Sequence, residues 1–210
     1  MGRYIGPSCR QCRREGMKLF LKGTKCETAK CQIERRQRSL APGMHGWRKA
    51  RLSEYGIRLR EKQKIKRYYG VYEQQFMRYF HLAERIKGNT GENLLQLLER
   101  RLDNVIYKVN FASSRKAARE FISHGHICVN GRKVDISDYI LKVGDKITVK
   151  NAEKSLKRVR QQLESNPNFA TQAWLQLDRE KPAATLVALP TREDVQIPVE
   201  EQLVVEICSR

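Results

Sequence analysis

An Asn130-Gly131 pair within residues 127–134 constrains the fold of this chain more than any other feature. Apolar residues alternate on both sides of the pair, and Asn-Gly is strongly favoured in the two-residue turn of a β-hairpin. Val143-Gly144-Asp145 predicts a second turn, which leads into a strand over residues 147–149. The sequence therefore predicts a short, mainly antiparallel sheet within residues 99–160.

Helical spacing of apolar residues precedes this hairpin. It predicts helices over residues 53–70, 72–88 and 90–105, each bounded by residues typical of helix ends. A further short helix should start with Ser113 or Ser114 as its N-cap and end at the next glycine. Two helices packed on the small sheet would then form one compact module.

The net charge of +19 is larger than solubility requires and indicates a polyanionic partner. Residues 1–50 hold thirteen Lys and Arg against three Asp and Glu, whereas residues 151–210 hold eight against nine. The basic surface is therefore expected in the first 150 residues. The longest apolar runs are far shorter than the roughly 18–20 residues that span a bilayer. Residues 1–7 lack the apolar core of a secretory signal, so we expect a cytoplasmic protein with no membrane partner.

Four cysteines have the spacing of a metal site. Cys9 and Cys12 form a Cys-x-x-Cys pair, thirteen residues separate Cys12 from Cys26, and four separate Cys26 from Cys31. Two close pairs joined by a short loop suit tetrahedral thiolate coordination, so we predict a Zn²⁺ ion here. An iron-sulfur cluster has the same donors and is the alternative ion. Four reduced cysteines that bind nothing remain the other interpretation.

Basic and aromatic residues alternate after the cysteines, in a loop over residues 41–49 where Pro and Gly prevent regular structure. Its Lys and Arg could contact phosphates while His45 or Trp47 stacks on a base or sugar. The alternative is that Trp47 anchors the loop to the core. The cations before and within this region are Arg35, Arg36, Arg48, Lys49 and Arg51.

Two further groups of cations follow along the chain. The polar face of the helix predicted at 53–70 carries Arg58, Arg60, Lys62, Lys64, Lys66 and Arg67. An exposed edge of the compact module is expected to gather Arg115, Lys116, Arg119, His124, His126, Arg132 and Lys133. Such patches have the size and charge to contact a nucleic-acid backbone.

Residues 99–149 resemble the small RNA-binding module named after small-subunit ribosomal protein four. The resemblance to that ribosomal protein family continues over nearly the whole chain. The matching motifs, in order, are Met1–Pro7 with the cysteines, Pro42–Gly46, Arg58–Lys64, Arg101–Val105 and Glu201–Glu206. The family pattern implies RNA contacts at Arg3, Tyr4, Arg10, Arg13, the 45–51 loop, the 58–67 face, Arg115, Lys116, Arg119, His124, His126 and Arg132.

The resemblance implies a primary binder of small-subunit (16S) ribosomal RNA that docks on a helix junction of the 5′ domain and nucleates assembly. It also implies a place in the ribosome beside small-subunit protein five, with protein twelve as a further candidate neighbour, near the channel where messenger RNA enters. There the protein would contribute to translational accuracy. Neither enzymatic activity nor a homo-oligomer is expected.

The resulting fold class is α+β, with a mostly helical N-terminal domain that contains the metal-bound cysteine cluster and a small RNA-binding module of two helices on a short sheet. The predicted divisions are a basic metal-binding segment (1–50), a helical domain (51–98), the RNA-binding module (99–160) and a C-terminal segment (161–210). The helix end and strands of the last segment are expected to pack back on the helical domain.

Two other classes of protein compete with this interpretation. Pseudouridine synthases and tyrosyl-tRNA synthetases carry a similar module, but the flanking sequence holds no catalytic aspartate segment and no nucleotide-binding pair of their type. A zinc-containing DNA-binding regulator would need a helix for the major groove and usually a dimer interface. Preference for structured RNA over duplex DNA would separate these classes.

Overall fold

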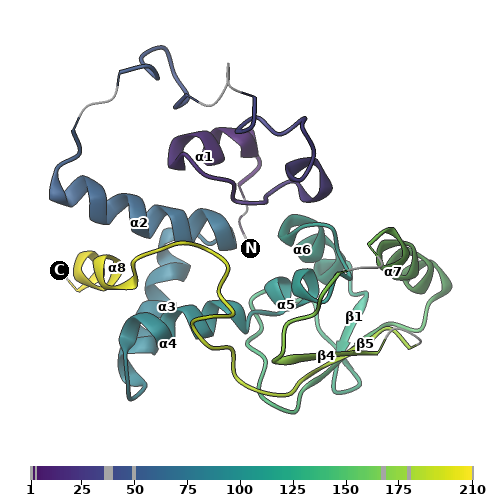
Figure 1. Ribbon diagram of the computed structural model, residues 1–210. Coiled ribbons are helices and arrows are strands. Elements are labelled where there is room, and N and C mark those ends of the chain that lie inside the picture. The colour runs from purple at the N-terminus through teal and green to yellow at the C-terminus, as the bar shows by residue number, and fades with distance from the viewer. Residues whose placement is uncertain are drawn as a thin grey trace. The chain divides into compact units, whose positions relative to one another are not determined.

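The computed structural model describes residues 2, 4–35, 40–48, 51–166, 169–178 and 181–209. Its helices are α1 (Ser8–Glu15), the 3-10 helix η1 (Gly23–Cys26), α2 (Glu54–Tyr69), α3 (Glu73–Arg85), α4 (Thr90–Glu99), α5 (Leu102–Lys108), α6 (Arg115–Ser123), α7 (Glu153–Ser165) and α8 (Glu201–Cys208). Its strands are β1 (Ile127–Val129), β2 (Arg132–Lys133), β3 (Lys146–Val149), β4 (Leu175–Asp178) and β5 (Ala183–Leu186). Figure 1 shows the order of these elements. The chain divides into two compact units, unit 1 (residues 1–94 and 196–210) and unit 2 (residues 95–195).

The predicted boundaries of α2 in unit 1 are confirmed. The Ser53 hydroxyl accepts a hydrogen bond from the Gly56 amide at 3.2 Å, which satisfies one of the unpaired donors at the helix start. Gly70 ends the helix with a φ of 64°, a left-handed conformation that glycine adopts without steric cost. The polar face of α2 therefore has the predicted extent.

Helix α8 packs along α2 in unit 1 (Figure 1). Arg58 Nε donates to Glu206 Oε2 at 2.5 Å, and the Glu200 amide donates to Glu61 Oε2 at 3.4 Å. A Cβ atom at Gly91 would lie 2.6 Å from the Glu201 Cβ, so only glycine fits where α4 begins. The helical end predicted for the C-terminal segment is thus present in unit 1.

The single helix predicted over 90–105 is wrong, because α4 ends at Glu99 and α5 begins at Leu102. Arg101 between them is extended, with φ −64° and ψ 136°, and it forms a β-bridge with Ile140. The Leu102 amide donates to the Tyr139 carbonyl oxygen at 2.9 Å. A tertiary contact with residues 139–141 therefore interrupts a helix that apolar spacing alone would have continued.

The hairpin that the Asn-Gly pair predicts is confirmed in unit 2. Asn130 and Gly131 both have positive φ, 50° and 80°, as a type I′ turn requires. β1 pairs antiparallel with β2, so that Val129 faces Arg132, and β1 also pairs antiparallel with β3. The Asn130 side chain donates to Asp145 Oδ1 at 2.8 Å, which ties the first turn to the second.

The strands predicted in residues 161–210 do not belong to unit 1. The sheet has the order β2-β1-β3-β5-β4, and every pairing is antiparallel. Ile147 of β3 pairs with Ala184 of β5, which places both in the same buried cluster as Trp174 and Phe121. These strands complete the core of unit 2, because the outer edge of β3 would otherwise remain without a hydrogen-bonding neighbour.

The protein is an α+β protein, as predicted, and its antiparallel sheet is larger than the short one expected. In unit 2 the apolar faces of α5 and α6 share one buried cluster with the strands. None of the described helices combines the length and apolar character needed to cross a lipid bilayer.

Candidate nucleic-acid interface

The cations of α2 are largely paired with carboxylates of the same unit. Arg58 pairs with Glu54 and Glu206, Arg60 and Arg67 with Glu15, Lys62 and Lys66 with Glu73, and Lys64 with Glu61. These six side chains are only 11–28 % exposed, and the Glu15 side chain is fully buried. The predicted RNA-binding face of α2 is therefore mainly a network of partly exposed ion pairs, and its RNA contacts stay a prediction.

The loop over residues 40–48 is held by arginines of α1. Arg13 Nε donates to the Leu40 carbonyl oxygen at 2.7 Å, and Arg14 Nη2 donates to that of Pro42 at 3.3 Å. Trp47 is 62 % exposed, and Arg48 lies over its ring at 4.9 Å. The alternative that Trp47 anchors the loop to the core is wrong, and stacking on a base stays a prediction.

The other predicted contacts of the first 51 residues fall into two groups. Tyr4, Arg10, Arg35, His45 and Arg51 are exposed, and Arg13 is half-buried beside the loop that it holds. The predictions for Arg3, Arg36 and Lys49 lie outside the described residues.

A buried ion network joins α5 and α6 in unit 2. Asp103 is 1 % exposed and receives hydrogen bonds from Arg101 Nη2 at 2.9 Å and from Arg119 Nε at 2.6 Å. Burial alone would raise the pKa of Asp103, but the two guanidinium groups outweigh burial and hold that pKa below its ordinary value. This carboxylate is thus ionised in the core and stabilised by two cations.

Arg115 belongs to the same buried region and not to the exposed edge where the sequence placed it. It is 5 % exposed, its Nε donates to Asn104 Oδ1 at 2.8 Å, and its guanidinium lies over the Tyr107 ring at 4.6 Å. Arg119 is also mostly covered, with 14 % of its side chain exposed. The expected exposure of these two arginines is wrong, because the side of α6 that carries them packs against α5.

The remaining predicted cations of the module do lie at its surface. His124, Arg132 and Lys133 are exposed, whereas His126 and Lys116 are half-buried. A Cβ atom added at Gly125 would overlap the aliphatic end of the Lys133 side chain, so Lys133 lies across the glycine that ends α6. The glycine and the hairpin together bring Lys133 next to the two histidines.

Lys150 and Arg158, which the sequence analysis did not single out, also lie at this edge. His126 Nδ1 and the Ser155 hydroxyl of α7 are 2.9 Å apart, and the Arg158 guanidinium lies 5.6 Å from the centre of the Phe121 ring. Burial, followed by the charges of His124, Arg158 and Lys150, lowers the pKa of His126. Residues 151–210 carry about as many acids as cations, so their net charge gave no indication of Arg158. The helical spacing of α7 is the signal that could have identified it.

The four cysteines of the predicted metal site lie close together in unit 1. Cys12, Cys26 and Cys31 are buried, and Cys9 is half-buried. Burial raises the pKa values of the Cys12 and Cys26 thiols, and repulsion from the neighbouring thiolates raises both further. The Lys22 amide lies 3.4 Å from Cys26 Sγ and donates to it. Among the described residues, no group of three or more His, Cys, Asp or Glu side chains has the arrangement of metal ligands, so the ion stays a prediction.

Comparison with known proteins gives consistent matches along the chain. Residues 3–99 match the ribosomal protein S4/S9 N-terminal domain family, and residues 100–147 match the S4 domain family. Proteins named small ribosomal subunit protein uS4 from Thermoanaerobacter sp. (strain X514) and Halothermothrix orenii are each 54 % identical to this chain. The protein of that name from Acetivibrio thermocellus is 53 % identical, and all three alignments cover 100 % of both chains.

Proposed function

The chain belongs to the small ribosomal subunit protein uS4 family, and from this premise we propose that it is a structural constituent of the small ribosomal subunit that binds the subunit's RNA. The observation that carries the proposal is the exposed basic edge of unit 2, where α6 ends and the β1–β2 hairpin begins. A buried core joins α6 to the strands at this edge, and the Arg119–Asp103 ion pair joins α6 to α5. A basic edge supported in this way is suited to reading the shape of a folded RNA through its phosphates and 2′-hydroxyls.

In this role the protein binds early to a junction of RNA helices in the 5′ domain of 16S ribosomal RNA and nucleates assembly of the subunit. Its work is positioning and not chemistry, so it acts without catalysis, in the cytoplasm. The neighbours that we propose are small-subunit protein five, with protein twelve as a further candidate, and messenger RNA near its point of entry. Through these neighbours the protein would contribute to translational accuracy.

The test of this function is the affinity of the full chain for a 5′-domain fragment of small-subunit RNA, with duplex DNA of equal length as competitor. We expect selective binding to the RNA, because the basic surface fits converging phosphates of a folded junction. Affinity should fall steeply with salt, since about six phosphate contacts give a log–log slope of about −4 to −5. Equal affinity for both polymers would contradict the proposal and favour the DNA-binding regulator.

Trp47 provides a second, local test of RNA binding. If a base stacks on its exposed ring, the Trp47→Ala substitution should weaken RNA binding by about 1–3 kcal/mol, because stacking on an aromatic residue is worth that much per base. The free energy of unfolding should stay within about 0.5 kcal/mol of the wild-type value, as for other exposed positions. Tyr55→Ala is the control, since Tyr55 is 61 % exposed but lies outside the loop. An unchanged affinity for Trp47→Ala would rule out stacking.

We also propose that Cys9, Cys12, Cys26 and Cys31 bind a Zn²⁺ ion. What supports the proposal is the chemistry and proximity of the donors, because four thiols lie within electrostatic reach of one another and three of them are buried. Bound zinc would hold the sulfurs as thiolates and offset the cost of burying their negative charges. The ion would serve folding of residues 8–31 and not catalysis. An iron-sulfur cluster is the alternative, and iron and sulfide analysis of the purified protein separates the two.

A further inference from the structure

The exposed end of α6 lies where three separate segments place cations close together. His124 and His126 have ring centres 6.1 Å apart at the end of α6, and Lys133 reaches them from β2 across Gly125. Lys150 follows β3, and its backbone amide donates to the His126 carbonyl oxygen at 2.7 Å. The cluster is therefore built by tertiary structure from residues 26 positions apart along the chain.

Helix α7 adds a fourth segment to this cluster. The Ser155 hydroxyl lies 2.9 Å from His126 Nδ1, which fixes the orientation of the imidazole. Three residues further along α7, the Arg158 guanidinium lies 5.6 Å from the centre of the Phe121 ring, while His126 stacks on Phe121 at 4.9 Å and 25°. Arg158 and His126 thus both contact the Phe121 ring, and the charge of Arg158 acts on His126.

The electrostatic environment at this place is positive. The charged groups that act on His126 are His124, Arg158 and Lys150, all of them basic, and after burial they lower its pKa. The cations of α2 are paired with carboxylates. The cations around His126 instead repel one another, and their positive potentials add. Mutual repulsion of this kind is relieved when an anion binds among the cations.

We propose that Lys150 and Arg158, together with His124, His126 and Lys133, form a binding site for an RNA phosphodiester. The inference rests on the proposed function and extends it, because it assigns α7 and the residue after β3 to the RNA-binding surface. The site holds the backbone of one RNA strand against the end of α6, with Ser155 and Phe121 positioning the His126 ring. Its contacts are to phosphate, so it contributes affinity and orientation and not base specificity.

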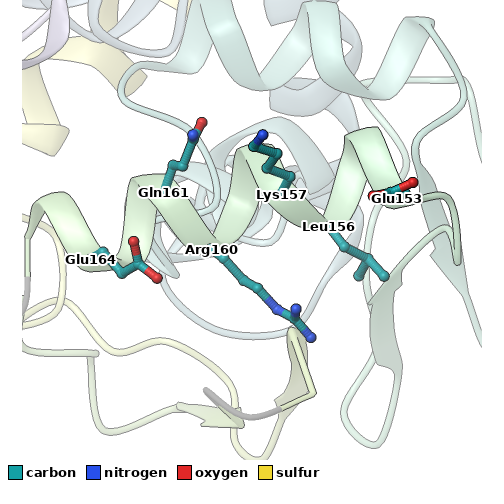
Figure 2. Close-up of a pocket in the computed structure, with 6 residues that line it drawn as sticks. All are labelled: Glu153, Leu156, Lys157, Arg160, Gln161 and Glu164. Carbon is teal, nitrogen blue, oxygen red and sulfur yellow. The ribbon is translucent and has the colours of Figure 1, made fainter.

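Other positions of α7 supply a matched control. The helix carries a shallow hollow of about 420 Å³, and its described lining residues are Glu153, Leu156, Lys157, Arg160, Gln161 and Glu164 (Figure 2). Lys157 and Arg160 are exposed there, among two carboxylates. Removing these two cations lowers the net charge by as much as removing Lys150 and Arg158, but it leaves in place the cations that act on His126.

The experiment compares the wild type with Lys150→Gln/Arg158→Gln and Lys157→Gln/Arg160→Gln for binding to the 5′-domain RNA fragment at several salt concentrations. We expect the first variant to bind at least about tenfold more weakly, with its log–log salt slope reduced in magnitude by about 1.4–1.8, because each lost phosphate contact removes about 0.7–0.9. The second variant should stay within about threefold of the wild type and keep its slope.

Equal losses in both variants would overturn the site and leave only general charge attraction. Wild-type affinity in both would overturn it as well, while the proposed function would stand as long as the wild type binds the RNA selectively. If the wild type itself fails to bind, the proposed function fails first. Two single substitutions control for misfolding. Arg158→Lys keeps the positive charge and should bind RNA like the wild type. Lys150→Gln removes one charge and should bind RNA about threefold or more weakly.

Discussion

Replacing Asp103 by alanine should lower the free energy of unfolding of unit 2 by about 3–5 kcal/mol, the range for breaking a buried ion pair by removing one partner. The substitution leaves Arg101, which is 0 % exposed, and Arg119 without the carboxylate that both of them contact. Buried guanidinium groups then repel each other in a medium of low polarity. This effect is large compared with the total stability of an ordinary domain, about 5–15 kcal/mol.

The loss can be measured by urea unfolding followed through Trp174 fluorescence. Trp174 is 2 % exposed in the core of unit 2, and a Trp47→Phe background removes the exposed tryptophan of unit 1 from the signal. Asp135→Ala is the matched control, because it removes an exposed carboxylate of the same unit and should change stability by less than about 0.5 kcal/mol. A loss below about 1 kcal/mol for Asp103→Ala would contradict the importance of the network.

The same carboxylate predicts a pH dependence of stability. Because the two arginines hold the pKa of Asp103 below its ordinary value, ionised Asp103 stabilises the fold fully above the pKa that it has in the unfolded chain. This contribution is lost as the pH falls through the lower pKa of the folded state. The difference in stability between the wild type and Asp103→Ala should therefore shrink as the solution is made acidic below the ordinary carboxylate range.

The buried network also changes which substitutions can test RNA binding. Charge reversal at Arg115 or Arg119 would place a carboxylate beside Asn104 or Asp103 in the core, and should destabilise unit 2. A loss of RNA binding in such variants would then report unfolding. Lys150 and Arg158 are exposed and suit the test better, because their removal leaves the Asp103 network intact.

Removing the proposed metal ligands should have the second large effect. The Cys9→Ser/Cys12→Ser variant should lose its zinc and unfold residues 8–31, since structural zinc supplies about 10–16 kcal/mol of apparent folding energy in isolated zinc modules. The consequence should extend to α2, because Glu15 at the end of α1 pairs with Arg60 and Arg67. Without α1 these two arginines lose a carboxylate that is fully buried in the intact protein.

Zinc content by elemental analysis and amide hydrogen exchange of residues 8–31 measure both parts of this prediction. Cys128→Ser is the control, since Cys128 lies in β1 of unit 2 and should leave the zinc content at one ion per chain. Replacement of zinc by Co²⁺ should give the visible absorption of tetrahedral thiolate coordination in the wild type alone. One zinc ion per chain in the double serine variant would refute the assignment of these ligands.

The elements that the sequence predicted well are those set by local chemistry. The Ser53 cap, the Gly70 stop, the Ser114 cap of α6 and the Asn130-Gly131 turn each depend on the conformational preferences of a few neighbouring residues. Full-length resemblance to one family was also visible in the order of short motifs, and it is confirmed by relatives that match over their whole length.

The surface was harder to predict, because a helical wheel shows which residues are polar but not what they face. The sequence pattern predicted that Lys62 and Arg67 belong to an exposed basic face. Their carboxylate partners, Glu73 and Glu15, come from the next helix and from α1. Arg115 was likewise predicted to be exposed because it is charged, although the turn that carries it faces α5. Burial of a charge depends on distant partners that single-sequence periodicity does not reveal.

By itself the sequence therefore determined the kinds of elements, most of their boundaries, the family and the presence of a large excess of positive charge. Only the tertiary structure decided which cations are neutralised in the interior and which remain at the surface. It ended α4 early by pairing Arg101 with Ile140, it moved β4 and β5 into the sheet of unit 2, and it brought Arg158 to His126. The physical reason is that local preferences act between near neighbours in the chain, whereas desolvation and ion pairing depend on neighbours in space.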